Sequence, residues 1–180
     1  MKRLAGVVLA LLSILIAALA VAAKPDVNTQ TINASLDGVH VIADGLTAHV
    51  VDVQVAKVPH LDASTLRYLV LVLEVTRTTN VTANVGATVT SSAGQTFQPG
   101  MWSTSPAPGF VTTVPVYFLM DIDAIPGARL ELTRDTGYIK GGFQRVYSID
   151  LGLTAERVAS LDAAASVADK PLPTTTEAIR

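Results

Sequence analysis

Apolar and polar residues alternate along most of this chain with a period of two. That pattern predicts β-strands, because successive side chains of a strand point to opposite faces. The segment Tyr68–Thr78 is instead an almost continuous apolar run, partly β-branched, and is suited to a central strand. Further strands are predicted at Thr31–Leu36, Val39–Ala43, Leu46–Val58, Asn84–Ser91, Gln95–Phe97, Val111–Met120, Ala128–Arg134 and Arg145–Leu153.

Turn residues separate these segments. Asp44-Gly45 is the pair most typical of a tight hairpin, and Ser92-Ala93-Gly94 is a second candidate turn. Pro115 cannot donate to a β-ladder and therefore predicts an edge or a bulge. Turn signals about every 8–12 residues predict seven or eight strands in an all-β antiparallel sandwich or small barrel. The absence of interleaved long helical patterns argues against a βαβ enzyme scaffold.

The pattern changes at both ends of the chain. Residues 24–30 contain Pro25 and polar residues and are interpreted as a linker, so the β-domain is assigned to residues 31–153. Residues 154–180 are expected to hold a short helix-prone segment, Thr154–Val167, followed by a disordered tail that contains Pro171 and Pro173.

Residues 1–23 have the features of an export segment. Two basic residues precede Leu4–Ala23, an uncharged stretch that as a helix would span roughly 30 Å, the thickness of a membrane hydrocarbon core. An uncleaved signal-anchor would make a single-pass membrane protein with its C-terminal domain outside the cytoplasm. A signal peptide cleaved near Ala22 or Ala23 would give a secreted protein. Both alternatives place the β-domain outside the cytoplasm.

Composition narrows the functional classes. The chain has 180 residues, 49% hydrophobic and only 16% charged, which excludes global disorder. It has no cysteine, so disulfides, thiolate metal sites and a lipid anchor on an N-terminal cysteine are excluded. Its net charge is −2, with no basic cluster of the kind that nucleic-acid binding requires.

The strand Arg67–Val75 resembles the signature strand of a family of bacterial extracytoplasmic domains of unknown function. Gln95, Phe97, Pro99 and Gly100 fit the middle of the family pattern, and Val114–Phe118 and Arg129–Leu132 fit its last strands. The family is related to a mycobacterial secreted immunogenic antigen. The resemblance extends over residues 39–132 and implies an immunoglobulin-like β-sandwich that binds or associates with the cell envelope. It supplies no catalytic residues.

The segment Gly94–Phe110 is the best candidate for a binding surface. It carries the single tryptophan, Trp102, together with Met101 and Phe110, in a run rich in Gly, Pro and Ser. Binding residues concentrate in loops mounted on a rigid scaffold, and aromatic residues are common at interfaces. In the alternative interpretation, Trp102 folds back as a lid over one end of the sandwich.

Metal chemistry has weaker candidates. A two-residue turn at Asp44-Gly45 would place His40 directly opposite His49, where two imidazoles could share a metal ion if a third ligand were added. The alternative is a structural polar pair in the hairpin. Asp121 and Asp123 could contribute oxygen ligands to calcium, or could be solvated carboxylates at a strand end.

The sequence therefore predicts a non-catalytic binding module of the cell envelope, with an envelope protein or a glycan as partner. It has neither a Gly-x-Ser-x-Gly nucleophile motif nor a glycine-rich phosphate loop, and no enzyme activity or cofactor is expected. One alternative is an accessory or assembly subunit of a membrane complex that uses the helix Leu4–Ala23. Another is a metal-dependent site at His40 and His49.

Overall fold

A computed structural model describes residues 28–61, 64–80, 83–100, 106–135, 143–168 and 172–179. These residues form an all-β fold with ten strands, more than the seven or eight predicted, and one α-helix, α2 (Ala155–Ala163). The strands are β1 (Asn28–Ala34), β2 (His40–Ala43), β3 (Leu46–Lys57), β4 (Leu66–Arg77), β5 (Asn84–Thr90), β6 (Thr96–Phe97), β7 (Phe110–Asp121), β8 (Arg129–Asp135), β9 (Phe143–Asp150) and β10 (Thr175–Ala178). A 3₁₀ turn, η1 (Ile122–Ala124), follows β7.

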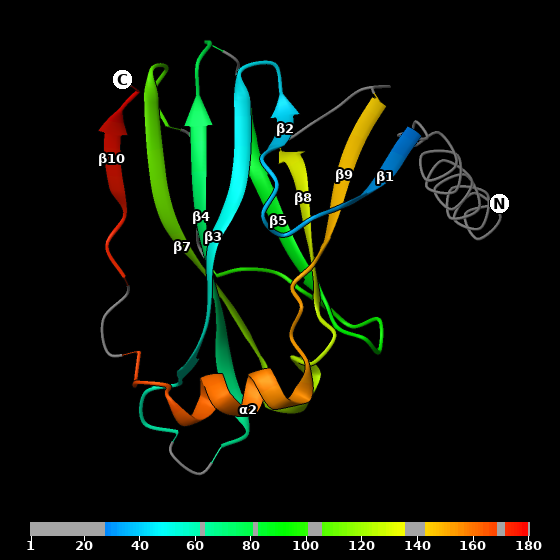
Figure 1. Ribbon diagram of the computed structural model, residues 1–180, viewed down its shortest axis with the longest axis vertical. Coiled ribbons are helices and arrows are strands. Elements are labelled where there is room, and N and C mark those ends of the chain that lie inside the picture. Colours follow the sequence, from blue (N-terminus) through cyan, green and yellow to red (C-terminus); the bar gives the residue numbers. More distant parts are fainter. Residues whose placement is uncertain are drawn as a thin grey trace, which may run out of the picture.

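The strands form two five-stranded sheets that lie as two layers (Figure 1). Sheet A has the order β1-β9-β8-β5-β6, and sheet B has the order β10-β7-β4-β3-β2. Neighbouring strands are antiparallel except β1, which runs parallel to β9. The predicted central strand is confirmed, because β4 lies between β3 and β7 along its whole length.

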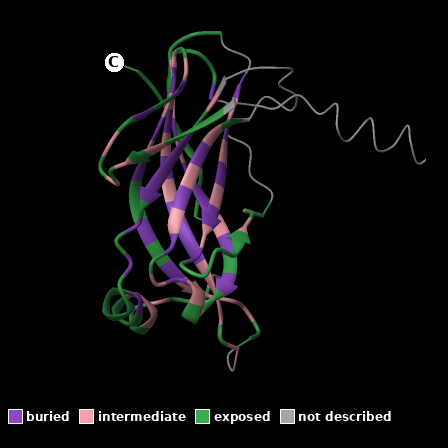
Figure 2. Cartoon of the chain, turned by 90° about the vertical axis from the view of Figure 1, so that its right-hand side faces the viewer, coloured by how far each residue is buried: buried purple, intermediate pink, exposed green. Residues whose placement is uncertain are grey.

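One apolar core lies between the two sheets. Alternate residues of β4 and β7, such as Leu71 and Phe118, are inaccessible to solvent and belong to the same cluster as Leu130, Leu132 and Ile149 of sheet A. Figure 2 shows the resulting alternation of buried and less buried positions along the strands. The period-two pattern of the sequence is therefore the pattern of contact with this core.

Two local features predicted from the sequence are found. Gly45, between β2 and β3, has a φ of +70°, in the left-handed region that glycine adopts without strain. Pro115 lies at an edge position of β7, because β10 pairs only with Phe110–Thr113. The carbonyl of Tyr117, two residues further along β7, accepts the Gly100 N–H from outside the sheet (3.2 Å). Residues two apart in a strand direct their backbone groups to the same side, so the position of the missing Pro115 N–H also faces away from β4.

The predicted opposition of His40 and His49 is wrong. A bulge between Val41 and Ala43 shifts the register of β2, so that His40 pairs with Ala48. Neighbouring residues of a strand face opposite sides, and His49 therefore lies on the other face of sheet B from His40.

The two ends of the β-domain also differ from expectation. β1 begins at Asn28, inside the predicted linker, and pairs with β9. Residues Thr175–Ala178, placed in the predicted disordered tail, form β10 on the edge of β7. Its side chains are all exposed, and β10 is held by backbone pairing and by a hydrogen bond between the Thr176 and Thr112 hydroxyls (3.2 Å), which an apolar pattern does not reveal.

Helix α2 forms within the helix-prone segment and lies across one end of the two layers (Figure 1). The Thr154 side chain caps it by accepting the Arg157 N–H (3.2 Å), and Val158 is buried in the core. Helix α2 covers this end of the described fold, and Trp102, the predicted lid residue, lies outside the described residues.

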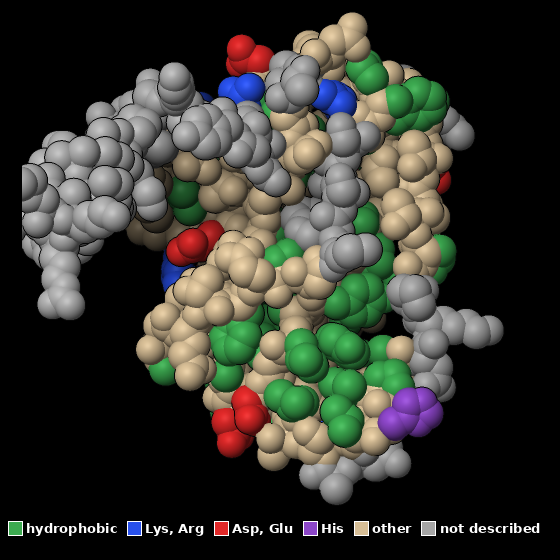
Figure 3. Space-filling view, turned by 180° about the vertical axis from the view of Figure 1, so that it is seen from behind, with side chains coloured by type: hydrophobic (Ala, Val, Ile, Leu, Met, Phe, Trp, Pro, Cys, Tyr) green, Lys and Arg blue, Asp and Glu red, His purple; other side chains and the backbone are tan. Residues whose placement is uncertain are grey.

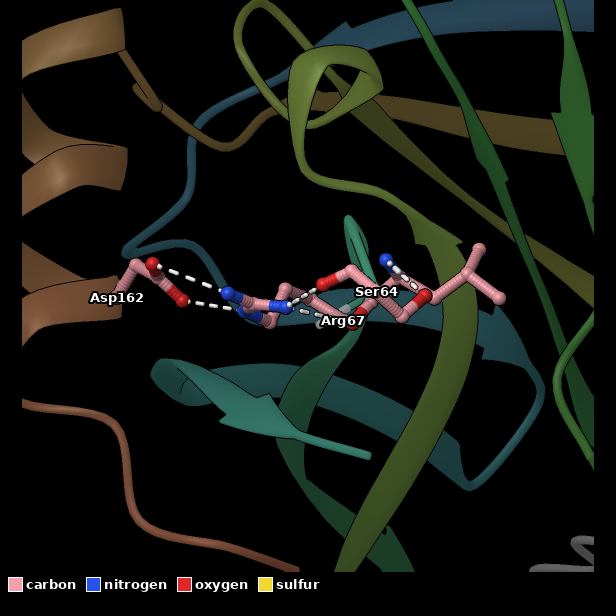
Figure 4. Close-up of polar contacts among 4 residues, drawn as sticks. Ser64, Arg67 and Asp162 are labelled. Atoms are coloured by element: carbon pink, nitrogen blue, oxygen red, sulfur yellow. Dashed lines mark hydrogen bonds and ion pairs between the residues drawn. The ribbon is translucent and has the colours of Figure 1, made fainter. Parts of the chain in front are cut away.

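A polar fork fixes the helix to β4 (Figure 4). Arg67 donates from Nε to Asp162 Oδ1 (2.5 Å) and from Nη2 to Asp162 Oδ2 (3.4 Å). Its Nη1 donates to the carbonyls of Ser64 (2.8 Å) and Leu66 (2.9 Å). The chain after α2 then runs beside β3, where Lys57 N donates to the Ser166 carbonyl and Ala168 N donates to the Lys57 carbonyl.

The predicted anchor or signal peptide, Leu4–Ala23, lies outside the described residues. Within the described ranges, no helix has both the length and the apolar character needed to cross a membrane.

Candidate binding site

The first part of the predicted binding loop connects the two sheets. After β6, the chain leaves sheet A and reaches the edge of β7 in sheet B, where Gly100 N donates to the Tyr117 carbonyl (3.2 Å). Gln98 and Pro99, in this crossing segment, line two separate grooves. The segment therefore separates two grooves, one on each sheet.

The first groove, called here the tyrosine groove, has a volume of about 540 Å³. It is lined by Tyr68, Gln98, Pro99, Gly100, Tyr117, Leu119 and Ala168. Tyr68 and Tyr117 come from adjacent strands, β4 and β7, and pack edge to face with ring centroids 5.8 Å apart. Leu119 is 46% exposed. The surface seen from behind shows an area where hydrophobic side chains gather (Figure 3).

This groove lies on the face of sheet B that points away from the core. Val70 is on the same side of β4 as Tyr68 and pairs with Tyr117, yet it is only 2% exposed and is not part of the core cluster. The outer face therefore has its own apolar contacts. The Tyr117 hydroxyl accepts the Leu172 N–H (2.7 Å), which fixes the C-terminal segment beside the groove.

The second groove, called here the edge groove, has a volume of about 300 Å³ and lies on sheet A. Its lining is mostly polar: Asn84, Val85, Gly86, Ala87, Thr88, Gln98, Pro99, Thr133, Arg134 and Gln144. Arg134 is the one charged side chain among these residues, and it is exposed.

Of the three predicted binding residues, the described structure contains only Phe110. Met101 and Trp102 lie outside the described residues. Phe110 is 37% exposed at the start of β7, where it pairs with Arg77 and Ala178, and it lines neither groove.

His40 is a buried structural residue. Its Nε2 donates to the Ser35 carbonyl (3.1 Å), and its ring lies 5.2 Å from the ring of Tyr147. Burial lowers the pKa of His40 below its ordinary value of 6.5; the Ser35 carbonyl opposes this shift and the charge of His49 adds to it. The described chain holds no cluster of three or more potential metal ligands, including around His49, Asp121 and Asp123.

Reasoning from the sequence missed Tyr68, Tyr117 and Leu119. A signal was present, because β4 and β7 carry apolar residues on both faces, whereas a strand with a solvated outer face alternates with polar residues. Apolar residues at outward positions indicate a second apolar surface, but they do not show that Pro99 and Ala168 line it.

Comparison with models of known protein families, with curated proteins and with solved structures finds no match to this chain.

Proposed function

We propose that this chain is a non-catalytic extracytoplasmic domain that binds a protein partner of the cell envelope through the tyrosine groove. The apolar segment Leu4–Ala23 supports export across a membrane, either as an anchor or as a cleaved signal. The resemblance of Arg67–Val75 to a family of extracytoplasmic domains supports the same location.

Strand order supports an immunoglobulin-like arrangement within this proposal. An immunoglobulin constant-type sandwich has strands A, B, E and D in one sheet and C, F and G in the other. Assigning β3, β4 and β7 to A, B and E reproduces the first sheet, and β5, β8 and β9 then follow as C, F and G. The difference is at the D position, because β10 from the C-terminus takes the edge beside β7.

The tyrosine groove is the observation that carries the binding function. Its volume is within the range of roughly 300–1,000 Å³ typical of binding pockets. Two tyrosines in edge-to-face contact offer rigid amphipathic surfaces, which are enriched where proteins meet. Leu119, Pro99 and Ala168 add aliphatic surface, which favours an apolar protein side chain over a heavily hydroxylated glycan.

A charge placed in the groove tests this function. The Leu119→Asp variant should retain the thermal midpoint of the wild type, because Leu119 is 46% exposed, but should lose capture of the partner by chemical crosslinking in envelope fractions. Val51→Asp is the matched control, since Val51 is 43% exposed on β3 of the same sheet and does not line the groove.

Two results would contradict the proposal. One is that Leu119→Asp and Val51→Asp capture the same partners as the wild type. The other is that the lost partner survives protease treatment of the envelope fraction, which would identify it as a glycan. Fractionation of cells, with the N-terminus and intact mass of the mature chain, tests the extracytoplasmic location. An uncleaved chain held in a complex through Leu4–Ala23 would favour an accessory subunit.

A further inference from the structure

Residues 172–179, called here the C-terminal segment, begin beside the tyrosine groove and continue along the edge of β7. The Leu172 N–H donates to the Tyr117 hydroxyl in the groove (2.7 Å), and Thr175–Ala178 then form β10, the outermost strand of sheet B (Figure 1). Ala168, four residues before Leu172, lines the same groove. The end of the chain therefore contacts both the groove and the neighbouring edge of the sheet.

β10 is held to β7 by few contacts. It pairs over four residues, all of its side chains are exposed, and it contributes no residue to the core cluster. Besides backbone pairing, the described residues give it the hydrogen bond between the Thr176 and Thr112 hydroxyls (3.2 Å). Segments with so little buried apolar contact are the ones that open most readily. β10 can therefore leave β7 with the loss of few contacts.

The direction of the backbone groups decides what β7 offers once β10 has left it. Ile179 N donates to the Gly109 carbonyl (2.8 Å), so the odd-numbered residues of β10 direct their backbone groups toward β7. Opposite them lie Val111 and Thr113, which pair with β10 through their own backbone groups. This part of the β7 edge can therefore pair with an extended backbone, whichever chain supplies it.

The tyrosine groove and the β7 edge together form the kind of surface that binds extended peptides. Such surfaces commonly combine a strand edge, which bonds to the peptide backbone, with a pocket that takes a side chain. The two parts are close here, because the Leu172 N–H that bonds to Tyr117 lies three residues before β10. The C-terminal segment thus marks the course that a bound segment would follow.

We propose that the C-terminal segment is a displaceable occupant of the partner site, and that an extended segment of the protein partner takes its place on β7 when the partner binds the tyrosine groove. This inference rests on the proposed function and adds its regulation, because the chain's own end competes with the partner. Binding of the partner releases β10, and weakening β10 strengthens binding of the partner.

Two proline substitutions in the full chain separate the release of β10 from other effects. Glu177→Pro removes an N–H that donates to β7, whereas Ala178→Pro, the matched control, removes one that faces away from β7. Both side chains are exposed, so both variants should keep the thermal midpoint of the wild type within a few degrees. In crosslinking with envelope fractions, Glu177→Pro should reach half-maximal capture of the partner at an about tenfold lower concentration than wild type or Ala178→Pro, because the competing segment loses roughly one hydrogen bond. Thr176→Val, which removes only the hydroxyl contact with Thr112, should give a smaller gain in the same direction.

A fluorescent peptide with the sequence of residues 172–180 serves as a probe of known composition. By fluorescence anisotropy it should bind Glu177→Pro about tenfold or more tightly than wild type or Ala178→Pro, in which the chain's own segment occupies the site. In excess, the same peptide should block capture of the partner by Glu177→Pro.

The inference is overturned if wild type, Glu177→Pro and Thr176→Val capture the partner equally, or if the peptide neither binds Glu177→Pro nor blocks capture. Thr176→Val gives the decision alone if Glu177→Pro lowers the thermal midpoint by more than Ala178→Pro does. Failure of the proposed function gives a different result, because the partner would then still be captured by Leu119→Asp.

Discussion

Removing the carboxylate that holds helix α2 should destabilise the fold measurably. In Asp162→Asn, the Arg67 guanidinium loses its ionic partner, while its bonds to the carbonyls of Ser64 and Leu66 remain. The side chains of Arg67 and Asp162 are only 14% and 24% exposed, so solvent replaces the lost contact poorly. A hydrogen bond to a charged group contributes about 1.5–3 kcal/mol. The expected loss in free energy of unfolding is therefore about 2 kcal/mol.

Thermal unfolding followed by circular dichroism measures this loss. For a domain of this size, each kcal/mol corresponds to roughly 2–4 °C, so the midpoint should fall by roughly 4–8 °C. Arg67→Lys keeps the charge but lacks the planar fork that reaches both carboxylate oxygens, and it should lose much of the same stability. Asp150→Asn is the matched control. Its carboxylate is 66% exposed and 3.8 Å from Arg129, so its loss should cost less than about 0.5 kcal/mol.

A double-mutant cycle decides whether the loss comes from the pair itself. With Arg67→Met as the second change, the coupling free energy between Arg67 and Asp162 should be about 1–2 kcal/mol. The reasoning would be refuted if this coupling free energy were near zero, or if Asp162→Asn lowered the free energy of unfolding no more than Asp150→Asn does. Either result would mean that the pair of Arg67 and Asp162 does not hold α2 in place.

Three further predictions concern the β-domain. Burial lowers the pKa of His40, so the free energy of unfolding should be highest above pH 6.5 and should fall as the pH drops below that value, by about 1.4 kcal/mol per unit of pKa lowering. Chemical denaturation from pH 7.5 to 5 measures this fall, and His40→Gln should make it smaller. An equal dependence on pH in the wild type and in His40→Gln would contradict the prediction. Tyr147→Phe removes an O–H that donates to a β2 carbonyl (2.8 Å) and should lower the free energy of unfolding by about 1 kcal/mol in urea titrations, so an unchanged midpoint would exclude a role for this bond. Gly45→Ala should lower the free energy of unfolding more than Gly94→Ala in the same titrations. Both glycines have a positive φ, which costs an alanine about 1–2 kcal/mol, but only at Gly45 would the new Cβ also overlap the Thr79 side chain. Equal losses in the two variants would mean that this overlap relaxes freely.

The sequence predicts the strands that contact the core but not the local shifts that position side chains. The hairpin at Asp44-Gly45 and the central strand β4 follow from turn chemistry and from apolar periodicity, which act over a few residues. The bulge in β2 depends on contacts from elsewhere in the chain. His40 bonds to the Ser35 carbonyl, and the carbonyl of Val41 accepts the Tyr147 hydroxyl from the other sheet. A one-residue shift in register reverses which face a side chain occupies, so the expected histidine pair is lost.

A second bulge, in β3, has the same effect on the neighbouring residues. The register between β3 and β4 shifts between Val50 and Asp52, so Val51 is exposed while Val53 and Val55 are buried. The alternation in the sequence places all three valines on one face, together with His49. Only the paired strand shows where an extra residue is accommodated.

The grooves could be predicted only in part for a related reason. The loop Gly94–Phe110 identifies the region of the crossing segment, and Gln98 and Pro99 do line both grooves. Gly100 of the same loop lines the tyrosine groove, but its other lining residues come from distant parts of the chain, such as Tyr68 and Ala168, and their proximity depends on sheet order and on the position of α2.

Several strand edges of the described residues are covered by groups from elsewhere in the chain. Unpaired edges are sites of unwanted strand pairing, and folded proteins commonly block them. In β2, the carbonyl of Val41 accepts a hydrogen bond from the Tyr147 hydroxyl. In β7, β10 and the Gly100 N–H cover edge positions on either side of Pro115, which has no donor of its own. Along β5, β6 pairs only with Val89 and Thr90, because Pro99, the residue in register with Ala87, has no N–H to donate to it. Val85 and Ala87 are nevertheless only 3% and 5% exposed, so this part of β5 is also covered.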